Sequence, residues 1–121
     1  PWIEVNPNYK EINVEKDLEN KDSIYRFYQK AINLRKSNEI LIDGAYALIA
    51  ADDSDIIAFV RESGNQKILV ICSFADKKIK FNNPFKGKDG KLLLSNYETA
   101  KPELNDVIYL QPYEGRAYIV G

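Results

Sequence analysis

The sequence contains no histidine, no methionine and a single cysteine. Without histidine, the chain lacks the usual general base near neutral pH, the Ser–His and Cys–His nucleophile arrangements, and the commonest metal ligand. Cys72 has no partner for an intrachain disulfide, which fits a reducing, cytoplasmic setting. Because no methionine is present and Pro1 opens a turn-rich stretch, we expect the chain to be an excised piece of a longer protein.

Strong charge of one sign and long apolar runs are also missing. The formal net charge is −1, so the chain has no excess of positive charge with which to bind nucleic acid or anionic lipid. The apolar runs Ile68–Cys72 and Ala45–Ala51 are too short to cross a bilayer, and the first residues do not resemble a signal peptide. A chain of 121 residues with 45% apolar and 29% charged residues fits one globular domain with a flanking element.

The first part of the chain is predicted to be a loop and a short helix. Residues 1–13 read as an ordered loop, because Trp2 and Tyr9 need a surface to pack on. These two rings are candidates for a sugar contact or an inter-domain contact. Asn13 is predicted to cap a short helix over residues 14–19.

A longer helix is predicted from Asn20 or Asp22 to Ser37, with Asn38 as its stop. Its apolar and aromatic positions are Ile24, Tyr25, Phe27, Tyr28, Ala31, Ile32 and Leu34. Together they cover more than the roughly 100° that one packing surface needs. We therefore expect several of them to be exposed in this chain or buried by a second copy, with self-association as the consequence.

After Gly44 the period changes to that of strands, and we expect Gly44 to adopt a backbone conformation that disfavours a Cβ atom. The predicted strands are residues 45–51, 56–62, 66–75, 78–82, 91–95, 107–110 and 116–120. Turn signals every 8–12 residues between short strands indicate an antiparallel β-sandwich. The predicted fold is thus mainly β, preceded by a loop and one long helix.

Three patterns resemble binding sites and have simpler structural explanations. Asp52, Asp53 and Asp55 form the densest acidic cluster, but no glycine lies there to shape a calcium loop, so a solvated hairpin turn is expected. Residues 87–91 lack the spacing of a phosphate loop and lead into a strand, so a hairpin turn is expected there as well. Cys72 lies in an apolar run and is expected to be an inert buried thiol.

Most of the aromatic residues are expected in the core. Phe59, Phe74 and Phe81 lie within predicted strands next to aliphatic residues. A carbohydrate-binding module needs two or three aromatic rings on one open face, and these strands offer few outside the expected core positions. We therefore expect no catalytic, cofactor-binding or metal-binding residue in this chain.

Several motifs resemble one known family along the whole chain, in the family's order. They are Pro1–Tyr9, Asn13–Lys16 through Asp22–Ile24, Leu34–Lys36, Gly44–Tyr46 and Leu110–Glu114. These segments are similar to the chain that follows the last barrel strand of oligo-1,6-glucosidases, to the final barrel helix, and to a "L-x-P-Y-E" strand near the end of the same enzymes. The resemblance identifies the chain as a member of the α-amylase superfamily (glycoside hydrolase family 13), in the group that includes trehalose-6-phosphate hydrolases.

The resemblance implies that residues 1–42 are the end of a (β/α)₈ barrel and that residues 43–121 are a Greek-key sandwich called domain C. The catalytic carboxylates would then lie upstream of Pro1, and no residue here matches a motif that carries them. One departure is Ser73, where relatives often have asparagine before the phenylalanine; serine can still bond locally to the backbone.

Two functions from different classes remain. The first is the non-catalytic C-terminal part of a cytoplasmic α-glucosidase, which stabilises the barrel and has the barrel of the same polypeptide as its partner; the parent enzyme would act on short oligosaccharides. The second is an independent carbohydrate-binding module. The resemblance implies no cofactor, and neither function involves nucleic acid or a membrane.

Overall fold

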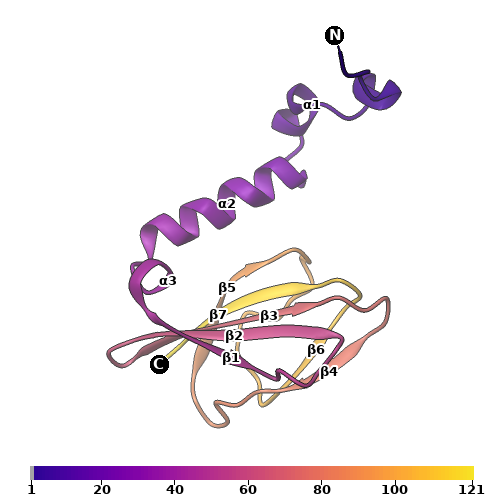
Figure 1. Ribbon diagram of the computed structural model, residues 1–121. Helices are drawn as coiled ribbons and strands as arrows, with labels where there is room; N and C mark the ends of the chain where they lie inside the picture. The colour runs from indigo at the N-terminus through magenta and orange to yellow at the C-terminus, as the bar shows by residue number, and fades with distance from the viewer. Residues whose placement is uncertain (1) are drawn as a thin grey trace. The chain divides into compact units, whose positions relative to one another are not determined.

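The computed structural model describes residues 2–121, which form two compact units (Figure 1). One unit ends at Asn33, and the other runs from Leu34 to Gly121. The helical elements are η1 (Pro7–Lys10), α1 (Val14–Glu19), α2 (Ile24–Ser37) and α3 (Ile40–Asp43). The strands are β1 (Ala45–Ile49), β2 (Ile56–Ser63), β3 (Gln66–Ser73), β4 (Ile79–Asn82), β5 (Gly90–Ser95), β6 (Val107–Leu110) and β7 (Gly115–Val120).

Side-chain caps set the ends of the helices in the first unit. The Asn13 side chain accepts a hydrogen bond from the Lys16 backbone N–H at 2.9 Å and starts α1, as predicted. Ser23 starts α2, because its Oγ accepts from the Arg26 N–H at 3.2 Å and donates to the Asp17 carbonyl at 2.7 Å. The long helix therefore begins at Ile24, slightly after the predicted start, because Ser23 provides both bonds at that point.

The apolar side chains of α2 are only partly covered. None of its residues is buried, and Ile24, Tyr28 and Ile32 are exposed, as the sequence pattern predicted. Trp2 and Tyr9 are also exposed, so the packing that we expected for the leading loop is not found within this unit.

The strands form two antiparallel sheets. The larger, called the large sheet below, has the order β1-β2-β3-β7-β5, and the smaller contains β4 and β6. After β3 the chain alternates between the sheets, and β7 returns beside β3 after three intervening strands, which is a Greek-key connection. Figure 1 shows the small sheet lying against the large one. The predicted antiparallel sandwich is confirmed.

The core lies between the two sheets and follows the strand alternation. On β2, Ile56, Ala58 and Val60 point inward, while the intervening side chains point outward. Leu69 and Ile71 on β3 continue the same inner face and are completely buried. The small sheet contributes Ile79, Phe81, Ile108 and Leu110 to this core.

A buried ion pair joins the two sheets. Glu114 is 0% exposed and Arg116 is 9% exposed, and Arg116 Nε donates to Glu114 Oε1 at 2.7 Å. The Arg116 guanidinium also donates to the Tyr118 hydroxyl at 3.1 Å and to the Tyr109 carbonyl of β6 at 2.9 Å. The second Glu114 oxygen accepts from the Gln111 backbone N–H at 2.7 Å. The pair thus connects β7 of the large sheet to the end of β6 in the small sheet.

The charge of Arg116 follows from its hydrogen bonds. Burial alone would lower the pKa of the Arg116 guanidinium, but the hydrogen bonds to Glu114 and Tyr118 outweigh burial and raise the pKa above its ordinary value. Arg116 is therefore charged at every working pH, and the carboxylate of Glu114 is needed to balance it inside the core.

The junction between helix and sheet is tight at Gly44. Its φ is −59°, which other residues adopt freely, so the expectation that the backbone conformation of Gly44 disfavours a Cβ atom is wrong. The requirement for glycine is steric instead: a Cβ atom there would lie 2.4 Å from the Ile40 carbonyl oxygen and 3.0 Å from that of Glu62. The short helix α3 ends at this point, and the chain enters β1 directly.

Replacing Gly44 should test this close approach. We expect Gly44→Ala to lower the free energy of unfolding by at least about 1 kcal/mol, because backbone atoms must move to admit the methyl group. Gly115→Ala is the matched control, since a Cβ atom there would meet only the Cys72 sulfur, at an ordinary 3.5 Å. Urea unfolding followed by circular dichroism measures both, and equal midpoints for the two variants would contradict the explanation.

The buried pair gives a second prediction. Glu114→Gln leaves the Arg116 charge in the core without its counterion, and we expect a loss of about 3–5 kcal/mol in the free energy of unfolding. Glu62→Gln, which removes the exposed pair with Lys67, should cost no more than about 1 kcal/mol. Similar losses in the two variants would show that the buried pair is not needed for stability.

Candidate functional site

The outer face of the large sheet, opposite the core, is apolar. Register and alternation put one set of side chains on this face. The apolar members of this set, called the outer face below, are Tyr46, Leu48, Ile57, Phe59, Ile68, Val70, Cys72, Leu94, Ala117 and Ile119. Tyr46 is 57% exposed, Leu48 is 53% exposed and Ile57 is 49% exposed, so the face is open along β1 and β2.

This composition is unusual for a sheet face in water. An antiparallel sheet with one solvated face alternates apolar residues inside with polar residues outside. Within the strands that the structure describes, the outward positions carry two charged side chains, Arg61 and Lys91, both towards one end of the sheet. A contiguous apolar area of this kind marks an interaction surface.

The aromatic side chains of the outer face lie on the strands near one edge of the sheet. The Tyr46 and Phe59 rings pack together, with centroids 5.3 Å apart and planes tilted by 35°. Phe59 is only partly buried and lies outside the core, and Phe74 follows β3 on the same side and is 60% exposed, so the core positions predicted for both residues are wrong. The prediction failed because Phe74 lies one residue beyond the end of β3, where alternation points it away from the core; Phe81 is buried as predicted.

Cys72 also belongs to the outer face and is half-buried rather than fully buried. Partial burial raises the pKa of its thiol above the ordinary value, because the thiolate loses solvation. The raised pKa agrees with the expectation of a weakly reactive thiol. The predicted burial in the core is wrong, because the sulfur lies on the outer face.

One end of this face is already covered by α3. Ile40 is buried, and α3 contacts β2 and β3. Arg61 fixes the helix to the sheet, since its Nη2 donates to the Ile42 carbonyl at 2.9 Å and its Nε to the Ile40 carbonyl at 3.4 Å. Ile68, which has an outward position on β3, is completely buried at this end.

The acidic cluster forms a turn between β1 and β2. The Asp53 side chain accepts from the Asp55 backbone N–H at 2.9 Å, and Asp55 pairs with Lys77 at 2.9 Å. Among residues 2–121, no group of three or more His, Cys, Asp or Glu side chains is placed to hold a metal ion. No helix in this same range is long and apolar enough to span a membrane.

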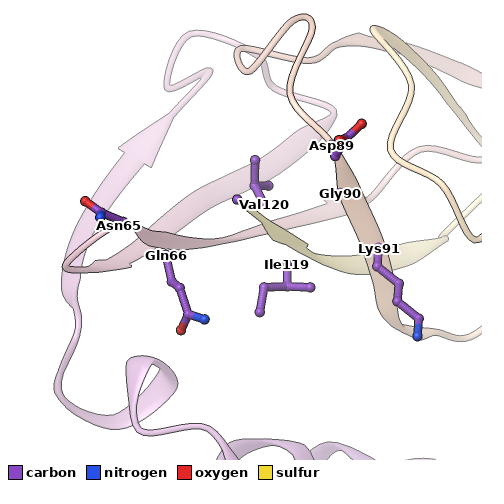
Figure 2. A pocket seen from close by; sticks show the side chains of 8 residues that line it. Asn65, Gln66, Asp89, Gly90, Lys91, Ile119 and Val120 are labelled. Carbon is purple, nitrogen blue, oxygen red and sulfur yellow. The ribbon is translucent and has the colours of Figure 1, made fainter.

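Two hollows lie on the surface of the sandwich. Figure 2 shows one of about 500 Å³, where Asp89 and Lys91 flank Gly90 and the end of β7 supplies Ile119 and Val120. Asp89 is the one acidic side chain among its lining residues, whereas glycoside hydrolysis uses a pair of carboxylates. A second hollow, of about 450 Å³, is lined by Arg116 and Tyr118 among others and by no carboxylate. The predicted lack of catalytic, cofactor and metal residues stays a prediction.

Sequence reasoning missed the buried Glu114–Arg116 pair. The signal was present, because residues two apart on a strand point to the same face, and an acid and a base at that spacing can pair. The resemblance suggested that Leu110–Glu114 forms a strand, but the structure shows no continuous strand there. β6 ends at Leu110, and Tyr113 turns the chain with a φ of +55° so that Glu114 enters the core.

The fold defines a β-sandwich domain preceded by helices, and two family models match these parts separately. Residues 1–44 match the alpha amylase catalytic domain, and residues 46–116 match the maltogenic amylase C-terminal domain. The chain belongs to the family of the maltogenic amylase C-terminal domain, whose model matches more than half of it, and its first 44 residues match part of the alpha amylase catalytic domain.

Individual relatives agree with this assignment. An oligo-1,6-glucosidase of Halalkalibacterium halodurans is 44% identical over 98% of the chain, which corresponds to 22% of that protein. The crystal structure of Bacillus licheniformis trehalose-6-phosphate hydrolase matches the whole chain with a TM-score of 0.90 and 38% identity. The trehalulose synthase of Pseudomonas mesoacidophila matches with a TM-score of 0.92 and 30% identity. The chain spans about a fifth of the length of these relatives.

The outer-face thiol provides a test by pH. The rate of alkylation by iodoacetamide increases with pH as the thiol ionises. Because burial raises the pKa of Cys72, the pH midpoint of this increase should be higher in the folded chain than in the same chain unfolded in urea. Mass spectrometry of the modified fraction over time gives both midpoints. If the two profiles coincide, the thiol is not desolvated as the structure describes.

Proposed function

We propose that this chain serves as the non-catalytic C-terminal part of an α-glucosidase and stabilises the catalytic barrel of the same polypeptide. The observation that carries the proposal is the two-part match to a catalytic domain over residues 1–44 and to a C-terminal domain over residues 46–116. The parent enzyme would hydrolyse α-glucosidic bonds of short oligosaccharides with retention of configuration. The name of the H. halodurans relative, oligo-1,6-glucosidase, supports this substrate class.

The lack of a catalytic role for the chain itself is supported by its hollows. Retaining glycosidases hold two carboxyl groups about 5 Å apart across the scissile bond. The two hollows described above contain at most one carboxylate each. A further hollow beside α1 and α2 contains Glu19 as its one acidic side chain.

The alternative of an independent carbohydrate-binding module is disfavoured by the composition of the outer face. Tyr46, Phe59 and Phe74 do provide rings on this side, which the sequence did not predict. A sugar site also needs a few placed polar groups that bind hydroxyls. The neighbours of Phe59 are Leu48, Ile57 and Val70. Arg61 lies opposite Tyr46, but it already donates to the carbonyls of Ile40 and Ile42, so the face is suited to apolar packing.

We also propose a cytoplasmic location, because the single cysteine is a free thiol and fits a reducing compartment.

The proposal predicts that the 121-residue chain releases no p-nitrophenol from an aryl α-glucoside, even at high protein concentration. The full polypeptide that carries this chain should do so with ordinary turnover, since the carboxylate pair would lie upstream. Activity of the short chain that survives repurification and is lost on mutation of Asp89 or Glu19 would overturn the proposal. A matched control is the same chain unfolded and refolded, which excludes a contaminating glucosidase.

A further inference from the structure

The hollow of about 450 Å³ on the sandwich lies beside the buried ion pair and is called the ion-pair hollow below. Arg116 and Tyr118 belong to its lining, although they are only 9% and 1% exposed. Both side chains lie on the core side of β7, opposite the outer-face residues Ala117 and Ile119. The polar side chains around the hollow in Figure 2, by contrast, are all exposed. Of these two hollows, the ion-pair hollow is therefore the one that reaches polar groups of the core.

Two buried donors in this lining keep a free hydrogen. The Arg116 guanidinium binds Glu114 through Nε and Nη2, and Nη2 also donates to the Tyr109 carbonyl. Its Nη1 donates one hydrogen to the Tyr118 hydroxyl, and within residues 2–121 the second Nη1 hydrogen has no acceptor. The Tyr118 hydroxyl accepts from Arg116, and the described chain contains no bond that this hydroxyl donates. Because buried donors are normally hydrogen-bonded, both groups are suited to an acceptor from a bound molecule.

The position of these donors favours a single acceptor oxygen. Arg116 Nη1 and the Tyr118 oxygen are 3.1 Å apart, so one further oxygen atom can lie within hydrogen-bond distance of both. Glu114 is not available for this bond. Its Oε1 accepts from Arg116 Nε and Ser95 Oγ, and its Oε2 accepts from Arg116 Nη2 and the Gln111 N–H.

The rest of the lining indicates the charge of the bound molecule. The other polar side chains around the hollow, none of them acidic, are Thr99, Lys101, Asn105 and Gln111. The Glu114 carboxylate balances the Arg116 charge, so Lys101 leaves the lining with a net positive charge. The acidic residues of the same loop, which do not belong to the lining, are Glu98, Glu103 and Asp106. A donor-rich hollow with positive charge favours an oxyanion over a neutral molecule.

The size and the apolar part of the hollow favour an organic anion over a bare ion. Val107 and Ile108 of β6 add apolar surface to the lining. The volume of about 450 Å³ is within the range of about 300–1,000 Å³ that is typical of small-molecule sites. A carbon group attached to the oxyanion would cover the apolar surface and remove it from water, which a bare ion does not do.

We propose that the ion-pair hollow binds a small organic oxyanion, either a carboxylate or a phosphate monoester. One oxygen of the anion accepts from Arg116 Nη1 and from the Tyr118 hydroxyl, and the exposed Lys101 adds positive charge. The carbon part lies against Val107 and Ile108. This site goes beyond the proposed function and does not depend on it, because Arg116 and Tyr118 lie on the side of β7 away from the outer face.

Amide NMR spectra of the isotope-labelled 121-residue chain test this binding. The probes are benzoate for a carboxylate, phenyl phosphate for a phosphate monoester, benzamide as the neutral counterpart of benzoate, and inorganic phosphate as the bare ion. We expect at least one of the two organic anions to give saturable shifts at the amides of Asn105, Ile108 and Tyr118, with a dissociation constant below about 10 mM. Benzamide and inorganic phosphate should bind at least about tenfold more weakly than that anion. The comparison of benzoate with phenyl phosphate decides between the two kinds of oxyanion.

Substitutions assign the binding to the proposed groups. Tyr118→Phe removes one of the two donors and should weaken binding of the organic anion at least about tenfold. Tyr97→Phe is the matched control, because the Tyr97 hydroxyl donates to the Pro112 carbonyl at 2.8 Å and lies outside the lining, so the dissociation constant should not change. Lys101→Gln should weaken binding about threefold and reduce its salt dependence, whereas Lys80→Gln on β4 should do neither.

Other results would overturn the proposal. Benzamide that binds as tightly as the organic anions would show that the hollow does not select for charge. Inorganic phosphate that binds as tightly as phenyl phosphate would indicate an adventitious ion only. Equal affinity in Tyr118→Phe and Tyr97→Phe, or no saturable shift with any of the four probes up to about 10 mM, would show that the two donors do not form a binding site.

Discussion

The ion pair between Glu114 and Arg116 is the interaction on which the sandwich depends. It lies where β7 of the large sheet meets the end of β6 in the small sheet, and every oxygen of the carboxylate is hydrogen-bonded. An ion pair in the core stabilises a fold only when its hydrogen bonds replace the lost water, and here Tyr118, Tyr109 and Gln111 provide them. Because the pair holds the two sheets together, the inner face of the large sheet is closed and its outer face becomes the surface available for a partner.

The outer face then determines what the domain can do. Catalysis by this chain would need a pair of carboxylates in a cleft, and the hollows of the sandwich described above hold at most one each. Sugar binding would need free polar groups beside the rings. Phe59 has aliphatic neighbours, and Arg61, which lies opposite Tyr46, is already bonded to the carbonyls of α3. Apolar docking uses the side chains that are present, and α3 shows that a segment of the catalytic-domain match already lies on this face.

Much of the fold was predictable from local pattern, and the functional surface was not. The seven strands were located to within two residues because short β-branched runs alternate with clear turn residues, and Asn13 was recognised as a cap from its position before α1. Phe59, Phe74 and Cys72 were misplaced because alternation says which residues share a face, but not which face points towards the core when both are apolar. α3 was missed since four residues are too few to show a helical period, and Gly44 was explained by the wrong cause because close backbone approach depends on tertiary packing. The boundary predicted between residues 42 and 43 stays a prediction.

The proposed function requires a contact between this domain and the catalytic barrel of the same polypeptide, and the outer face of the large sheet is the open apolar surface that the domain offers for it. Hydroxyl-radical footprinting of the full polypeptide and of the 121-residue chain measures this coverage directly, because oxidation reports the solvent access of individual side chains. The account predicts that Tyr46 and Phe59 are oxidised readily in the short chain and are protected in the full polypeptide, while Tyr109 on the small sheet is oxidised equally in both. Equal oxidation of Tyr46 and Phe59 in the two proteins would contradict it.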